Sequence, residues 1–197
     1  MITLLSAALI ALVATPADVD FDPTKISEVD AIECKLDVPS YNGFAFAITG
    51  EEQIARKRGW RKVAGRNPML EEYELPAPIT VAGKWSTRRI AFSSSGVVAI
   101  LDVADPAVVA KGEGIANAAD AEEMYKELGI APPADCFRKF LGEKVIVDRT
   151  VPASADDPFG SHVTIARSIS NVSTLPGKTL YGCSYRMELL GKDGKPL

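Results

Sequence analysis

Short apolar stretches, most of them alternating with polar residues, recur along this chain and constrain its fold more than any other feature. Because successive side chains of a β-strand point to opposite faces, such stretches predict strands with one face in a core. The predicted strands are residues 31–38, 43–49, 69–75, 79–81, 88–92, 97–101, 144–149, 162–169 and 179–190. Clusters of Gly, Pro, Asn and Ser separate several of them and predict turns, which favours a mostly antiparallel sheet.

Two of these clusters predict β-hairpins, and two prolines predict an irregular strand. Pro39–Gly43 ends in Asn-Gly between the first two predicted strands, and Ser93–Gly96 separates a later pair. Pro76 and Pro78 predict a sheet edge or a kink, because proline cannot donate a hydrogen bond to a neighbouring strand.

Helices are predicted in three places. Thr49 followed three residues later by Glu52 forms a capping box, which predicts the start of a short helix that stops at Gly59. The three predicted helices cover residues 50–58, 117–128 and 135–141. We therefore expect an α+β fold, in which a mixed, mostly antiparallel sheet carries two or three short helices packed on one side.

The composition, 47% hydrophobic and 24% charged over 197 residues, is that of one ordinary globular domain. Its core is expected to combine one face of each predicted strand. The predicted core residues are Ile32, Leu36, Phe44, Phe46, Ile48, Val81, Ile90, Phe92, Val98, Ile100, Val145, Val147, Ile165, Tyr185 and Met187.

The N-terminus predicts export. Residues 2–14 form an uncharged, mostly apolar run, and Thr15-Pro16-Ala17 places small residues at a cleavage site. Since a membrane-spanning helix needs about 20 apolar residues, the run is typical of a signal peptide, although it lacks a basic residue before it. A buried N-terminal helix or strand, or an uncleaved anchor, is the alternative.

The expected organisation is a signal peptide over 1–17, an acidic mature N-terminus over 18–30, one globular domain over 31–190 and a flexible tail over 191–197. The mature protein is then periplasmic or secreted, with no transmembrane span after the leader is removed.

Three cysteines, Cys34, Cys136 and Cys183, lie far apart and form no CxxC pair. In an oxidising compartment we expect one disulfide and one free thiol, with all three pairings open. Cys34 and Cys183 are each predicted to lie on the apolar face of a strand. Cys136 is expected at a helix N-terminus, where a lowered thiol pKa would make it reactive, but no motif supports a nucleophilic role.

One segment is strongly basic although the whole chain carries a net charge of −4. Six of the 22 basic residues fall within positions 56–66, which contain no acidic residue and include Trp60. The candidate anion-binding residues are Arg56, Lys57, Arg58, Trp60, Arg61, Lys62 and Arg66. The alternative is a solvated surface neutralised by acidic neighbours such as Glu71, Glu72 and Glu74.

The sequence offers little for catalysis. A single histidine, His162, excludes metal centres that need two imidazoles from this chain, and the spacing of Asp18, Asp20 and Asp22 fails as a calcium loop. We expect no metal and no cofactor. The catalytic alternative is a hydrolase whose site is assembled from distant loops around His162, with Asp156 or Asp157 as its carboxylate.

Together these observations favour a small, exported, non-catalytic binding or accessory protein. Its expected partners are an anionic lipid, lipopolysaccharide or an acidic polymer, and the acidic composition argues against nucleic acid. A structural envelope protein that acts as an oligomer is a third possibility.

Overall fold

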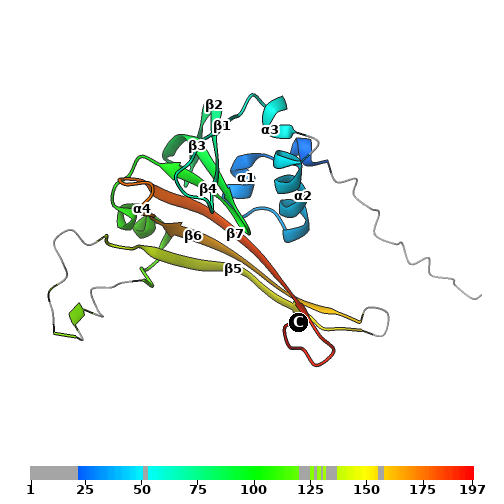
Figure 1. Ribbon diagram of the computed structural model, residues 1–197. Helices are drawn as coiled ribbons and strands as arrows, with labels where there is room; N and C mark the ends of the chain where they lie inside the picture. The colour runs from blue at the N-terminus through cyan, green and yellow to red at the C-terminus, as the bar shows by residue number, and fades with distance from the viewer. Residues whose placement is uncertain are drawn as a thin grey trace, which may run out of the picture.

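The computed structural model describes residues 22–50, 53–119, 125–126, 128–129, 131, 137–154 and 158–197. Within these ranges it confirms the predicted α+β class: one antiparallel sheet of seven strands has the order β1-β2-β3-β4-β7-β6-β5 (Figure 1). Short helices contribute apolar side chains to a single large buried cluster against the sheet. The leader prediction, residues 1–17, lies outside the described residues.

The elements follow one another in a simple order. They are η1 (Pro23–Lys25), α1 (Glu28–Ile32), α2 (Val38–Thr49), α3 (Ile54–Lys57), β1 (Arg61–Val63), β2 (Glu71–Val81), β3 (Trp85–Ser93), β4 (Gly96–Leu101), α4 (Pro106–Glu113), β5 (Leu141–Val151), β6 (Gly160–Ser170) and β7 (Thr179–Leu190). None of the described helices is long and apolar enough to cross a membrane.

The predicted hairpin over 31–49 is wrong, because this region forms helices α1 and α2. The Asp37 side chain accepts a hydrogen bond of 2.7 Å from the backbone N–H of Ser40 and caps α2, which carries Pro39 in its first turn. Tyr41, Phe44 and Ile48 then share one buried helical face. A spacing of three and four residues, and not simple alternation, determines which side chains are buried.

The other helix predictions are partly wrong. Thr49 is the last residue of α2, and α3 covers only Ile54–Lys57 of the predicted range 50–58, although the chain does turn at Gly59 with a φ of +71°. Residues 137–140 are not helical. Their backbone is bonded to side chains: Asn171 Oδ1 accepts from Phe140 N–H at 2.8 Å. Half of the predicted helix 117–128 lies outside the described residues.

The later strand predictions are confirmed. Ser93 pairs with Gly96 across the β3–β4 turn, and β7 has the predicted bounds. The proline pair interrupts β2 without ending it, because the pairing register with β3 shifts between Glu74 and Ile79. Across this shift the Arg88 side chain donates to the carbonyl oxygens of Leu75 and Pro76 at 3.0 and 3.1 Å.

Strands β5, β6 and β7 continue past the helices as a long, curved arm (Figure 1). None of the described helices covers the outer part of the arm, and Val145, Val147 and Met187, which were predicted to lie in the core, are exposed. Phe46 was also predicted to be buried but is 78% exposed, because it lies on the outer side of α2. The tail after β7 folds back, and Leu190 bridges to Pro196.

A disulfide joins the helices to the sheet. Cys34, in the turn after α1, is bonded to Cys183 of β7, and their Cα atoms are 5.3 Å apart. Cys34 is therefore not on a strand; its φ of 57° reverses the chain after α1. The third cysteine, Cys136, lies outside the described residues. Of the three pairings the sequence leaves open, the structure selects this one.

Loss of this disulfide should weaken the fold. Replacing both Cys34 and Cys183 with Ala is expected to lower the free energy of unfolding by about 2–5 kcal/mol, because the bond closes a long loop of the unfolded chain. Urea unfolding followed by circular dichroism measures this change. Alkylation before reduction should label Cys136 alone, and labelling of Cys34 in the native oxidised protein would contradict the pairing.

Candidate ligand-binding groove

The structure divides the predicted basic segment into residues with different roles. Arg58 serves the fold: its guanidinium pairs with Glu28 at 2.9 Å and donates to the carbonyl oxygens of Thr24 and Ile26. The same group lies over the rings of Phe44 and Trp60. Trp60 is only 8% exposed, so it belongs to the core and offers no stacking surface.

The remaining cations of the segment form two groups. Arg61 is paired with Glu74 and Lys62 with Glu71, as the alternative of internal neutralisation expected. Arg56, Lys57 and Arg66 are exposed and form no ion pair with a described residue.

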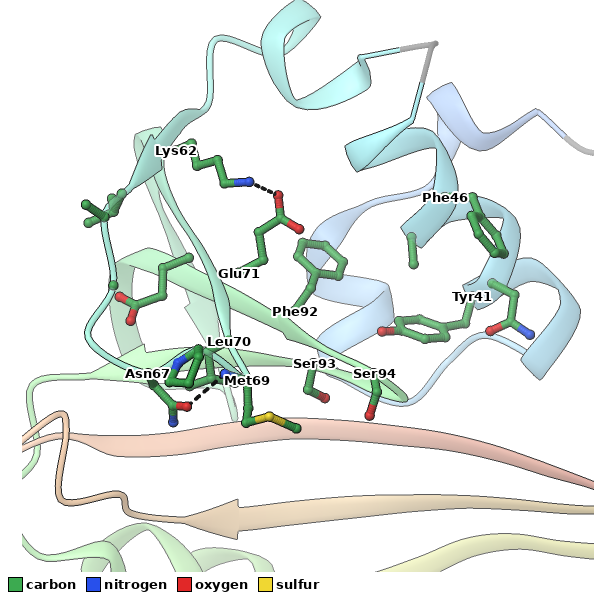
Figure 2. Close-up of a pocket in the computed structure, with 17 residues that line it drawn as sticks. Tyr41, Phe46, Lys62, Asn67, Met69, Leu70, Glu71, Phe92, Ser93 and Ser94 are labelled. Atoms are coloured by element: carbon green, nitrogen blue, oxygen red, sulfur yellow. Dashed lines mark hydrogen bonds and ion pairs between the residues drawn. The ribbon is translucent and has the colours of Figure 1, made fainter.

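A hollow of about 680 Å³ lies between α2, the β1–β2 connection and the β3–β4 turn (Figure 2). Its volume is within the range of about 300–1,000 Å³ that is usual for small-ligand sites. Its apolar lining includes Tyr41, Phe46, Met69 and Phe92.

A second hollow of about 280 Å³ adjoins the first. Both are lined by Lys62 and Glu71, and the second is also lined by Arg56, Trp60 and Tyr73. The two hollows share the Lys62–Glu71 pair in their linings, and together they are called the groove. Arg56, an exposed cation of the basic segment, lines only the second hollow.

The ion pair between Lys62 and Glu71 is held in place by a hydrogen bond from the core residue Tyr73. Glu71 Oε1 lies 2.5 Å from Lys62 Nζ and accepts a hydrogen bond of 2.6 Å from the Tyr73 hydroxyl. Burial alone would raise the pKa of Glu71, but these two hydrogen bonds outweigh burial and hold the pKa below its usual value. Burial and the contact with Glu71 both raise the pKa of Tyr73. Glu71 therefore stays ionised and Tyr73 stays neutral at pH 7.

Two buried polar atoms, each on a residue that lines the main hollow, have no hydrogen-bond partner among the described residues. They are the hydroxyl oxygen of Tyr41 and the Oε1 atom of Glu72, whose other oxygen is paired with Arg89. Tyr41 is 2% and Glu72 is 1% exposed. Buried polar groups are normally bonded, because leaving one unpaired costs about 1–3 kcal/mol.

The position of Tyr41 is fixed by stacking. Its ring lies parallel to that of Tyr185, with centroids 4.2 Å apart, and Tyr185 in turn donates to the carbonyl oxygen of Ala31 at 2.7 Å. Figure 2 shows the Tyr41 hydroxyl directed from α2 toward Phe92 and Ser93. The stacked pair therefore fixes the position of the Tyr41 ring, whose hydroxyl is buried.

The weak catalytic candidate, His162, lies elsewhere, on strand β6 in the arm. Its Nε2 is 2.8 Å from Asp148 Oδ1 and its Nδ1 is 3.8 Å from Glu188 Oε2. The other two candidates, Asp156 and Asp157, lie outside the described residues. His162 lines neither hollow of the groove. Among the described residues no group of three or more His, Cys, Asp and Glu side chains is placed to hold a metal ion.

Comparison with known proteins gave no match to a family model, to a curated protein or to a solved structure. The groove and its charges are therefore the features that bear on function. Sequence reasoning found Arg56 and Lys62 but missed Tyr41, Glu72 and Phe92 as groove residues. In the sequence these three residues stand among apolar or ion-pairing neighbours, as ordinary core residues do. No local pattern therefore distinguishes them as groove residues.

Because His162 is the single histidine of the chain, its pKa can be measured directly and reports on the pairing between strands of the arm. The hydrogen bond to Asp148 raises the pKa of His162 above its ordinary 6.5, and the charges of Asp148 and Glu188 add to this. Since the raised pKa favours the protonated form in the fold, this stabilisation is present below pH 6.5 and is lost as pH rises through the folded-state value. NMR titration should show the raised pKa, and Asp148→Asn should lower it. Equal values in both proteins would contradict the pairing.

Proposed function

We propose that this protein is an exported, non-catalytic binding or accessory protein that holds an anionic component of the cell envelope along the groove. The observation that carries the proposal is the pair of hollows that share Lys62 and Glu71, the second of which is also lined by Arg56. Lys57, next to Arg56, is also exposed and adds charge beside the second hollow. An anion in the second hollow would lie near two cations that form no ion pair with a described residue.

Lys62 can bind the same ligand with only a small loss of the free energy that its ion pair contributes. Its side chain is 67% exposed, and an exposed ion pair contributes only about 0–1 kcal/mol. If Lys62 turned toward a ligand, Glu71 would keep the hydrogen bond from the Tyr73 hydroxyl. The ligand would therefore compete with a weak pair and leave no buried carboxylate without a partner.

Export is supported by the disulfide between Cys34 and Cys183, since such bonds persist in oxidising compartments. It agrees with the leader expected over residues 1–17 and with a periplasmic or secreted location. The competing hydrolase would need a second site on the arm, where the described partners of His162 are the carboxylates of Asp148 and Glu188.

The proposal is tested by removing the two unused cations. Arg56→Gln with Lys57→Gln is expected to weaken binding to lipopolysaccharide-coated beads and to phosphatidylglycerol vesicles by about 2 kcal/mol, or about 30-fold, at low salt. The matched control is Lys111→Gln with Lys192→Gln, which removes the same charge from exposed positions outside the groove. Sedimentation at increasing salt measures both. Equal binding by the two double variants would overturn the proposal.

A further inference from the structure

We infer that the ligand of the groove is a single-chain anionic lipid: its acyl chain lies in the main hollow, and its charged head lies in the second hollow beside Arg56 and Lys62. This inference rests on the proposed function and narrows its ligand to one chemical class. An apolar molecule without a charge and a small anion without a chain are the alternatives that the experiment distinguishes.

Two large apolar side chains that line the main hollow are unusually exposed. Phe46 of α2 is 78% exposed, and Met69 of the β1–β2 connection is 71% exposed (Figure 2). Val63 and Pro68 in the same connection add partly or fully exposed apolar carbon to this lining. One exposed apolar side chain is ordinary, but several around one concavity are typical of a site that an apolar ligand covers.

Several polar side chains of the main hollow are already bonded within the fold. The Ser93 hydroxyl donates to the carbonyl oxygen of Gly96 at 3.3 Å, and Asn67 Oδ1 accepts from the backbone N–H of Met69 at 3.0 Å. These groups offer little to a ligand that needs hydrogen bonds, and an acyl chain needs none. A peptide would instead bring backbone N–H and C=O groups that require partners, so a lipid chain fits the hollow better.

Charge complementarity assigns the head of the lipid to the second hollow. Arg56 lines only this hollow, Lys62 lines both, and the neighbouring Lys57 is also exposed. The Glu71 carboxylate, which both hollows share, is held by hydrogen bonds from Lys62 and from the Tyr73 hydroxyl. Because a lysine side chain has an apolar stem below its charge, a chain can pass along Lys62 from one hollow to the other.

The concave shape of the site favours one chain over an intact membrane surface. The main hollow lies between α2 and the β1–β2 connection and has a volume of about 680 Å³, within the usual range for small ligands. A flat bilayer would touch only the rim of such a hollow. A single acyl chain can enter it and cover both Phe46 and Met69.

Calorimetric titration with three probes tests this assignment. Decanoate has both the chain and the charge, decanol has the chain alone, and acetate has the charge alone; all are used below the concentrations at which they aggregate. We expect decanoate to bind most tightly and acetate not to bind measurably. Decanol should bind about fivefold more weakly than decanoate, because exposed ion pairs contribute little. Arg56→Gln with Lys57→Gln should remove this difference and leave decanol affinity unchanged.

The apolar contacts are tested by Phe46→Gln with Met69→Gln. This double variant should weaken the binding of decanoate and of decanol about 30-fold, because two large apolar side chains no longer cover the chain. Both positions are exposed, so its unfolding temperature should equal that of the parent protein. The matched control is Met187→Gln with Leu189→Gln, which removes two exposed apolar side chains that line neither hollow and should leave both affinities unchanged.

Methionine methyl groups report where the chain binds. Met69 lines the main hollow, whereas Met187 lies on β7 in the arm and is 49% exposed. In protein labelled with ¹³C at its methionine methyl groups, decanoate should shift the resonance of Met69, which the Met69→Gln variant assigns. The resonance of Met187 should not move, and a shift of Met187 in place of Met69 would overturn the site.

The two proposals fail in different ways. The lipid assignment is overturned if decanoate does not bind, if acetate binds as tightly, or if Phe46→Gln with Met69→Gln keeps the parent affinity. Lipopolysaccharide binding that still depended on Arg56 and Lys57 would then support the proposed function alone. If decanol binds as tightly as decanoate and Arg56→Gln with Lys57→Gln changes neither affinity, the anionic head is overturned and only an apolar site is left.

Discussion

The largely buried pair of Glu33 and Arg167 connects the N-terminal helices to the sheet, and the packing of the other elements follows from this connection. Glu33 accepts from the Arg167 guanidinium at 2.7 Å, from the Tyr181 hydroxyl at 3.0 Å and from the backbone N–H of Ala82 at 2.7 Å. A buried charge is tolerated only when it is paired and its remaining hydrogen bonds are made, so this geometry allows α1 few other positions. The disulfide from the next residue, Cys34, closes the same junction.

The shape of the groove depends on this junction between α1 and the sheet. Once α1 is fixed, α2 follows after a short turn and packs Tyr41 against Tyr185, whose hydroxyl bonds back to Ala31 of α1. The opposite wall, the β1–β2 connection, is held to the sheet by pairing of β1 with β2. The groove therefore lies between two walls that are fixed independently, which is how a site keeps polar atoms in place before a ligand arrives.

The cations of the basic segment, residues 56–66, have different roles in the structure. Arg58 holds the N-terminal residues through the carbonyl oxygens of Thr24 and Ile26, and Arg61 and Lys62 pair with carboxylates across the β1–β2 ladder. Arg56, Lys57 and Arg66, which form no ion pair with a described residue, remain for a ligand. Counting charges along the chain therefore overestimates an anion-binding surface, because cross-strand neighbours neutralise part of it.

Local sequence patterns were enough to predict the class of the fold, the strands from β3 onward and the kink at Pro76 and Pro78. They also showed the unusual charge of residues 56–66. These features depend on local periodicity and on backbone chemistry, which neighbouring residues express directly. Long-range packing determines that 31–49 contains two helices, that Cys34 pairs with Cys183, that Phe46 and Met187 are exposed, and that Tyr41 and Phe92 line the same hollow. The reason is that burial, pairing and unsatisfied hydrogen bonds are properties of residues far apart in the chain, and no local pattern records which of them become neighbours.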